Sequence, residues 1–165
     1  MSWATMSISE LQRFAERLAR KEWHLQIHMD SSLIAQMAPA LASLPVTVVI
    51  DHMGRIDASK GIDQPPFAAL QALLKNDNIW VKVSGSERCS RLDPPYSDAT
   101  PFARQLLENY SDRVVWGTDW PHPNFRAAPP DDGMLFDLLT EIAPTESLLK
   151  ALLVDNPMKL YRFEK

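Results

Sequence analysis

The sequence predicts an α/β fold in which parallel strands are joined by crossover helices. Apolar segments of strand length begin near Trp23, Val46, Ile79 and Val114, and each is followed by a stretch with helical periodicity. Strands that alternate with helices in this way build a parallel sheet. The run from Val46 to Ile50 has almost no polar alternation, which is typical of a strand buried on both faces. The pattern fits both a small open sheet and part of a closed barrel.

The composition is that of a folded domain. The chain has 165 residues, of which 45% are hydrophobic and 23% charged, and its formal net charge is −4. No run of Lys and Arg is present to neutralise phosphates, so nucleic acid is not an expected partner. No apolar stretch approaches the roughly 18 residues that a membrane span needs, so no membrane association is expected.

Cysteine content and the first residues bear on the cellular compartment. Cys89 is the only cysteine, which excludes an internal disulfide and a cysteine-rich zinc site. The opening MSWATMSIS has neither the basic nor the apolar region of a secretory signal. We therefore expect a cytoplasmic location.

Periodicity, caps and breakers place the individual elements. Ser7 and Glu10 have the spacing of a capping box before the first helix. Pro39 is expected to end or kink the second helix early, and the segment from Gly85 to Asp98 is expected to be a polar loop. The expected elements are, in order, a helix over 8–18, a strand over 23–28, a helix over 32–42, a strand over 46–50, a helix over 67–74, a strand over 79–85, a helix over 102–110, a strand from 114, and closing helices over 134–142 and 146–154.

Polar side chains that can do chemistry follow every predicted strand at its carboxyl end. In parallel α/β folds these ends form one rim, where ligands and catalytic groups collect. We therefore expect the side chains to converge on one site. They are His28 after the first strand, Asp51 and His52 after the second, Ser84, Glu87 and Arg88 after the third, and Asp119 and His122 after the fourth.

Each of these residues also has a structural interpretation. A histidine at a strand end can simply satisfy a nearby backbone group, and Asp119 can serve as a helix cap or a turn residue. Arg55 and Arg88 can bind a substrate carboxylate through paired hydrogen bonds, or they can pair with acidic neighbours on the surface. His24 lies at the opposite end of the first strand from His28, so we expect it to be structural.

Four segments of the sequence resemble a known family. These segments are VVIDHMGR, VKVSGSER, VVWGTDWPHPN and DNPMKLYRF. They resemble the second half of the barrel in the amidohydrolase superfamily, and within that superfamily they are most similar to the 2-pyrone-4,6-dicarboxylate lactonase group. The likeness runs from about Ile8 to Phe163. It implies that the chain is the C-terminal half, about strands five to eight, of a (β/α)8 TIM barrel, since such barrels typically have about 250 residues.

The resemblance also implies what is missing. Family members carry a His-x-His pair after the first barrel strand, whereas this sequence has no histidine before His24. Residues 1–165 would then form a single partial domain that lacks the first half of the barrel. Because a four-stranded half exposes two unpaired edges, the expected partner is a second copy in a homodimer or a separate N-terminal half-barrel.

For the site, the resemblance implies the residue set of a lactonase. Asp119 would act as general base on a water molecule, and His52 would polarise the lactone carbonyl. No metal or other cofactor is expected in this group. In the metal-dependent alternative, the zinc ligands would be His28, His52 and Asp119. The substrate would be bound by four residues, Arg55, Arg88, His122 and His28.

The function implied by the resemblance is a hydrolase that opens a cyclic ester of a small carboxylic acid, as in the breakdown of aromatic compounds. The substrate would be a small carboxylated lactone similar to 2-pyrone-4,6-dicarboxylate. Because half of the barrel is absent, the isolated chain is expected to have little or no activity. Two alternatives stay open: a non-catalytic half-barrel that acts as a fragment or assembly partner, and a zinc-dependent amidohydrolase or decarboxylase relative.

Overall fold

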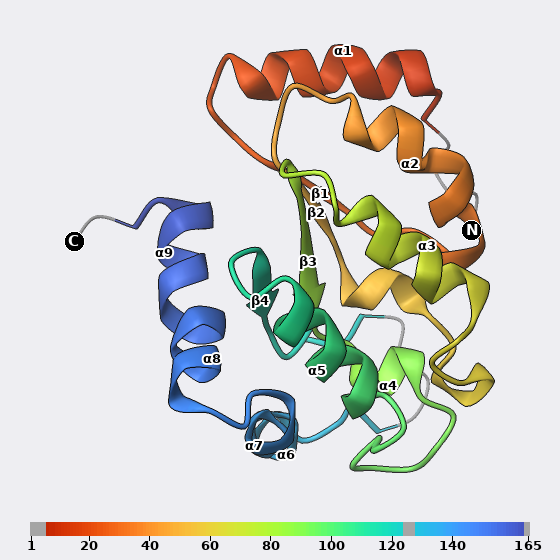
Figure 1. The fold of residues 1–165 in the computed structure, drawn as a ribbon, viewed down its shortest axis with the longest axis vertical. Helices are drawn as coiled ribbons and strands as arrows, with labels where there is room; N and C mark the ends of the chain where they lie inside the picture. Colours follow the sequence, from red (N-terminus) through yellow and green to blue (C-terminus); the bar gives the residue numbers. More distant parts are fainter. Residues whose placement is uncertain (1–5, 124–127, 164–165) are drawn as a thin grey trace.

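The fold is built on one sheet of four parallel strands. A computed structural model describes residues 6–123 and 128–163. The strands are β1 (Leu25–Ile27), β2 (Val48–Ile50), β3 (Ile79–Val83) and β4 (Val114–Trp116). They lie side by side in chain order, and each neighbouring pair is parallel (Figure 1). The predicted class is confirmed, although β1 and β2 are shorter than the apolar runs that contain them.

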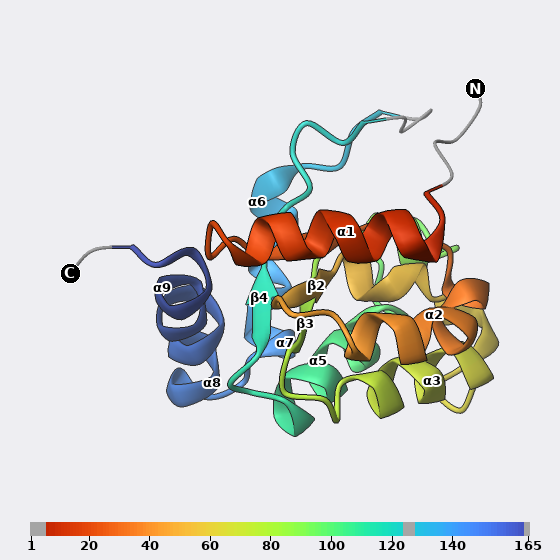
Figure 2. The ribbon, with the colours of Figure 1, turned by 90° about the horizontal axis from the view of Figure 1, so that it is seen from above.

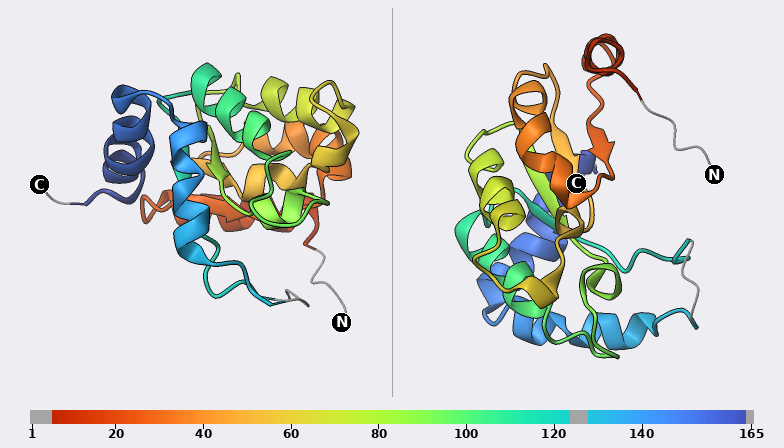
Figure 3. Two further views of the ribbon diagram at one scale, coloured as in Figure 1. Left: turned by 90° about the horizontal axis from the view of Figure 1, so that it is seen from below. Right: turned by 90° about the vertical axis from the view of Figure 1, so that its right-hand side faces the viewer.

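Helices pack against this sheet, and three of them lie together on one face. Their bounds are α1 Ile8–Ala19, α2 Ile34–Ala42, α3 Pro65–Leu73, α4 Ser86–Cys89, α5 Thr100–Asn109, α6 Asp132–Asp137, α7 Leu139–Ile142, α8 Glu146–Lys150 and α9 Asn156–Tyr161, with short 3₁₀ segments η1 Ser31–Leu33, η2 His52–Arg55 and η3 Ala58–Lys60 and a π-helical segment η4 Ala151–Asp155. Helices α2, α3 and α5 lie on the same side of the strands (Figure 3, right). At the other end of the molecule, η4 and α9 pack against β4, and Figure 2 shows α8 and α9 there. None of the helices in the described segments has the length and apolar character of a membrane span.

Helix ends and interruptions follow the sequence only in part. The capping box is confirmed, because Ser7 Oγ accepts from the Glu10 backbone N–H while the Glu10 carboxylate accepts from the Ser7 N–H. Pro39 does not end the helix early, since α2 continues through it to Ala42. The helix is held there by tertiary packing: Ile34 and Leu41 are fully buried, and α2 packs along α3.

Two further segments differ from the prediction. The expected loop after β3 contains the short helix α4, whose residues Ser86, Glu87 and Cys89 are buried. No helix was predicted for the terminal NPMKLYRF segment, but its residues Asn156–Tyr161 form α9. The proline of this segment lies in the first turn of the helix, where the backbone N–H has no partner within the helix and its absence therefore costs little. In both cases the helix forms because its residues are buried against the rest of the chain, and the local sequence periodicity does not reveal this burial.

The strands present two different faces. Side chains alternate along a strand, so Val48 and Ile50 join the main core under the helices while Val49 lies on the opposite face. A small second cluster forms on that face, and it consists of Val49, Trp80, Val115 and Leu160.

Toward the carboxyl ends of the strands this second face becomes polar. Asp51 follows β2 and accepts two hydrogen bonds from the Gln26 amide, at 2.9 and 3.0 Å. Lys82 Nζ lies 3.1 Å from the same carboxylate. Because Gln26 is on β1 and Lys82 is on β3, these contacts tie three strands together next to the site described below.

Asn156 fastens the C-terminal helices to β4. It is 4% exposed, and its Nδ2 donates to the carbonyl oxygens of Ser111 at 2.8 Å and Val114 at 2.7 Å. We expect Asn156→Ala to lower the free energy of unfolding by about 1–3 kcal/mol, because buried carbonyl groups lose their partner. Urea unfolding measures the change. In the control variant Asn109→Ala, which alters an exposed amide, the loss should be about 0.5 kcal/mol or less, and equal losses would contradict the argument.

Candidate functional site

Polar side chains from neighbouring strand ends meet at one edge of the sheet. His52 directly follows the β2 segment and Asp51, Ser84 directly follows β3, and Asp119 lies in the loop after β4. Parallel strands bring their carboxyl ends to the same edge. A pocket at this edge is lined by Gln26, Asp51, His52, Lys82, Ser84, Trp116, Gly117, Thr118, Asp119, Trp120 and Tyr161.

His52 lies at the centre of this group and is 7% exposed. Its Nδ1 is 2.8 Å from Ser84 Oγ, and its Nε2 is 3.3 Å from Asp119 Oδ1. Burial lowers the pKa of His52, and the negative charge of Asp119 opposes part of this effect. Both ring nitrogens therefore have a polar partner, and burial favours the neutral ring.

The Asp119 carboxylate is shared between an imidazole and a guanidinium. Arg88 donates from both Nε and Nη2 to Asp119 Oδ2, and its Nη2 also donates to the carbonyl oxygen of Pro123 at 3.0 Å. The Arg88 and Asp119 side chains are only 11% and 13% exposed. Both carboxylate oxygens of Asp119 are thus oriented, one by His52 and one by Arg88.

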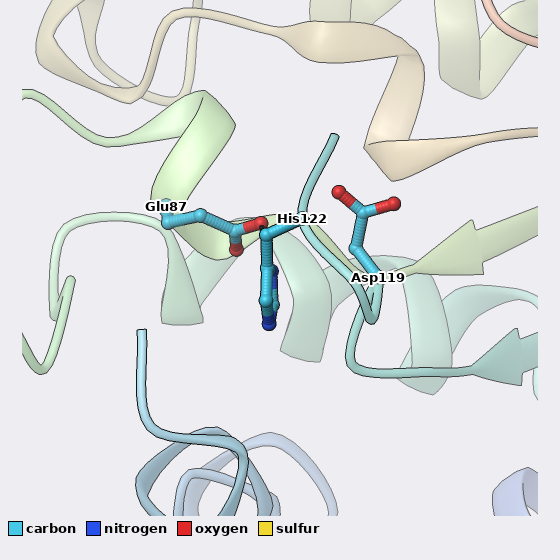
Figure 4. Close-up of side chains that lie close together, drawn as sticks. All are labelled: Glu87, Asp119 and His122. Atoms are coloured by element: carbon cyan, nitrogen blue, oxygen red, sulfur yellow. Dashed lines mark ion pairs between the residues drawn. The ribbon is translucent and has the colours of Figure 1, made fainter. Parts of the chain in front are cut away.

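A second buried pair lies beside Asp119 (Figure 4). The Glu87 side chain is fully buried, and neither of its oxygens has a hydrogen-bond partner among the described residues. Burial raises the pKa of Glu87, and the negative charge of Asp119 acts in the same direction. His122 Nδ1 is 3.5 Å from Glu87 Oε1, and His122 Nε2 is 3.2 Å from Asp132 Oδ1. His122 therefore lies between two carboxyl groups, with a hydrogen bond to the partly exposed Asp132 and a longer ionic contact to the buried Glu87.

His28 and Arg55 lie outside the tight group. Both residues are exposed. The His28 ring faces that of His52 edge-on, with centroids 5.2 Å apart. Partial desolvation of the ring lowers the pKa of His28, and the positive charge of Arg55 adds to the effect. Both side chains are accessible to a molecule bound at the site.

Backbone strain is concentrated in the segments that carry these side chains. In the described part of the chain, eight non-glycine residues have a positive φ. Such a conformation costs on the order of 1–3 kcal/mol and persists where the surrounding structure enforces it, often at functional sites. Five of the eight belong to the two loops of the site, and these are His52, Met53, Arg55, Asp119 and His122.

Comparison with known proteins identifies the family. An Amidohydrolase family model matches residues 2–163. This chain belongs to the amidohydrolase family. The resemblance inferred from the four sequence segments is thereby confirmed, and the match extends over nearly the whole of this chain.

Two curated amidohydrolase relatives match well over part of their length. The chain is 45% identical over 161 residues to the 2-pyrone-4,6-dicarboxylate hydrolase of Comamonas testosteroni, an alignment that covers 92% of this chain and 53% of the relative. It is 42% identical over 142 residues to the 4-sulfomuconolactone hydrolase of Hydrogenophaga intermedia, with 85% and 47% covered. The chain spans about half the length of the curated relatives it matches.

Solved amidohydrolase structures show the same fold. A Pseudomonas putida protein assigned as a 2-pyrone-4,6-dicarboxylic acid hydrolase superposes with a TM-score of 0.84 at 31% identity, over 100% of this chain and 62% of that one. An Acinetobacter baumannii protein with the same assignment and bound citric acid gives 0.82 at 25%, over 97% and 61%. A zinc-bound amidohydrolase of Burkholderia multivorans shares the fold, with a TM-score of 0.79 at 16% identity, over 94% and 58%. The four-stranded sheet is therefore half of a TIM barrel, as the sequence predicts.

The zinc bound to the Burkholderia multivorans amidohydrolase raises the question of whether the residues of this site could hold a metal. Within the described segments, ligand atoms of Glu87, Asp119 and His122 lie within 4.8 Å of one another, a set that differs from the predicted His28, His52 and Asp119. Two carboxylates and an imidazole suit a divalent cation. However, the Arg88 guanidinium is bonded to Asp119, and its Nε lies 3.7 Å from Glu87 Oε1. A fixed positive charge among the ligands opposes a second cation, so these residues as arranged do not fit a metal.

The structure brings some of the predicted site residues together and leaves others apart. His52, Arg88 and Asp119 are in direct contact, and His122 lies beside them. The sequence placed Ser84 and Glu87 at a strand end without giving them a role, although their position after β3 was a usable signal. Asp132 was missed, because no local pattern links it to His122 and only the fold brings the two together.

Proposed function

We propose that this chain supplies the general base and the carbonyl-polarising histidine of a lactone hydrolase. The observation that carries the proposal is the Asp119 carboxylate, held between His52 Nε2 and the Arg88 guanidinium at the carboxyl end of the sheet. A carboxylate oriented in this way can accept a proton from water. The names of the two curated relatives support a lactone as the substrate class.

In the proposed reaction, Asp119 takes a proton from a water molecule while the water oxygen attacks the lactone carbonyl. The Nε2–H of His52, which contacts Asp119 in the free chain, shifts to the carbonyl oxygen, where negative charge develops. Asp119 then returns the proton to the ring oxygen as the C–O bond breaks. The product is one open chain with a hydroxyl group and a new carboxylic acid, which releases its proton to the solvent and becomes a carboxylate.

The proposed substrate is a small lactone that carries carboxylates, similar to 2-pyrone-4,6-dicarboxylate. Arg55 and Arg88 would bind its carboxylates, since a guanidinium matches a carboxylate with two parallel hydrogen bonds. At Arg88 the substrate would compete with Asp119 and so free the base. His28 and His122 would line the rest of the substrate site. The citric acid bound to the Acinetobacter baumannii relative supports a small polycarboxylate as ligand.

We expect this chemistry to proceed without a metal or another cofactor. The support is local: Arg88 already places a positive charge between Asp119 and Glu87, where a cation would have to bind. Chelators should leave the activity of the assembled protein unchanged, and added Zn²⁺ should not raise it. Loss of turnover with a chelator, restored by Zn²⁺, would favour the zinc-dependent alternative.

Activity of this chain is expected to depend on a second half-barrel. The chain spans about half of its curated relatives, and in the described residues β1 and β4 each pair with one neighbouring strand. The partner would be a second copy of the chain or a separate N-terminal half-barrel. The alternative function is a non-catalytic half-barrel that serves only in assembly.

A reconstitution experiment separates these possibilities. The chain is assayed alone over a range of concentrations, and together with the segment of the Comamonas testosteroni relative that it does not match. Hydrolysis of 2-pyrone-4,6-dicarboxylate is followed by the loss of pyrone absorbance. We expect little turnover by the dilute chain and clear turnover once a second half is supplied, by self-association or by the added segment.

Folding is checked in the same samples through Cys89. Burial raises the pKa of this thiol to about 12, so iodoacetamide should label it slowly in the folded chain and rapidly in urea. A chain with a protected Cys89 that assembles with the second half and hydrolyses no lactone would contradict the proposed function. That result would favour the non-catalytic alternative.

A further inference from the structure

The hydroxyl of Ser84 is placed against one nitrogen of His52. Ser84 is 2% exposed and directly follows β3, and its Oγ is 2.8 Å from His52 Nδ1. The opposite ring nitrogen, Nε2, faces Asp119 Oδ1 at 3.3 Å. The imidazole therefore lies between two different partners. The Ser84 hydroxyl can donate or accept a hydrogen bond, whereas the Asp119 carboxylate, when it is ionised, can only accept one.

These two contacts determine which nitrogen carries the proton. An ionised Asp119 can only accept, so the hydrogen of this contact belongs to His52 Nε2. Burial lowers the pKa of His52, which favours a neutral ring with a single N–H. The lone pair is then on Nδ1, and the Ser84 hydroxyl is the group positioned to donate to it.

The backbone next to Ser84 is shaped around the same ring. Gly85 has a φ of 68°, and a Cβ at this position would lie 2.9 Å from both Cβ and Nδ1 of His52. His52 itself has a φ of 50°. The ring is confined between the end of β3 and Asp119, and a half-turn of the ring would put carbon atoms where the two polar contacts now form.

We infer that Ser84 is a positioning residue whose hydroxyl keeps Nδ1 of His52 as an acceptor and so keeps the proton on Nε2. Its importance for catalysis rests on the proposed function, because a developing oxyanion needs an N–H donor and a lone pair at that position would repel it. The tautomer of the free protein does not depend on any substrate. It can therefore be measured separately from activity.

Nitrogen-15 NMR of the histidine side chains tests this inference. The chain has four histidines, so the His52 signals are identified by their loss in His52→Gln. At a pH at which the ring is neutral, we expect a protonated Nε2 and an unprotonated Nδ1 in the unmodified chain. In Ser84→Ala the tautomer ratio should move about fivefold toward the Nδ1–H form, the change that loss of one neutral hydrogen bond supports.

Two further variants keep the test decisive. Ser86→Ala removes a buried hydroxyl close in sequence and should leave the His52 spectrum unchanged. Ser84→Cys keeps a weak donor and should shift the tautomer ratio less than Ser84→Ala does. If Cys89 labelling shows that Ser84→Ala is unfolded, the comparison of Ser84→Cys with the unmodified chain tests the inference instead. A protonated Nδ1 in the unmodified chain would overturn the inference, and so would equal tautomer ratios in the unmodified chain and the folded Ser84 variants.

The same spectra separate this inference from the proposed function. If the assembled protein hydrolyses no lactone but His52 carries its proton on Nε2 in a Ser84-dependent way, the proposed function fails and the positioning role stands. If lactone turnover is normal and the tautomer does not respond to Ser84, the positioning role fails alone. In the assembled enzyme, Ser84→Ala should lower kcat more than it changes KM, because the oxyanion contact forms in the transition state.

Discussion

Replacing Asp119 with asparagine should slow lactone hydrolysis by the assembled protein about 10²–10⁴-fold, the usual contribution of a general base. Asparagine has nearly the same shape as aspartate, and its side-chain oxygen can still accept from Arg88. It cannot take a proton from water at neutral pH. The expected effect is therefore on kcat, measured as loss of pyrone absorbance at saturating substrate.

The control is the same substitution at an exposed carboxylate. Asp112 is 68% exposed and pairs only with the adjacent Arg113, at 3.4 Å, among its described contacts. Asp112→Asn should retain full turnover. If Asp119→Asn were also fully active, the base would have to be another group, and Glu87 would be the first to test because burial raises its pKa.

Much of the fold could be predicted from the chain alone, and the reason is local. Val48 to Ile50 are apolar without interruption, and Ile79 to Val83 are apolar except for Lys82, because these two strands lie in the middle of a parallel sheet whose side chains are buried in the main core or in the smaller cluster on the opposite face. This burial is visible in the sequence as a run of apolar residues. The helix α4 has no such sequence signal, since its four residues are too few to show a helical period and its conformation depends on the burial of Glu87 and Cys89.

The site was predictable by position but not by contact. Strand ends selected His52, Arg88 and Asp119 because parallel topology brings these ends to one edge. Which atoms touch depends on loop conformations, including a φ of 73° at Asp119, that no sequence pattern encodes. For this reason the pairing of Arg88 with Asp119, rather than with a surface carboxylate, emerged only from the structure.

Gly85 is the backbone position at which fold and site depend most directly on each other. Its φ of 68° is in the left-handed region, and a Cβ would lie 2.9 Å from His52. We expect Gly85→Ala to lower the free energy of unfolding by about 2–5 kcal/mol, because strain in the left-handed conformation adds to overpacking against a confined ring. Urea unfolding measures this loss.

Gly61→Ala separates the two causes of that loss. Gly61 also has a positive φ, of 78°, but a Cβ there would have no atom within 4 Å among its described neighbours. Its ψ of 168° belongs to a region that is essentially restricted to glycine, so Gly61→Ala should show backbone strain without a clash, about 1–3 kcal/mol. A loss in Gly85→Ala beyond the about 1–2 kcal/mol of left-handed strain then indicates the contact with His52, and a displaced ring should also lower the turnover of the assembled protein, which Gly61→Ala should leave intact. A loss in Gly85→Ala of about 2 kcal/mol or less, together with normal turnover, would mean that His52 moves aside freely, and the confinement that orients its Nε2 toward Asp119 would have to come from Ser84 and Asp119 alone.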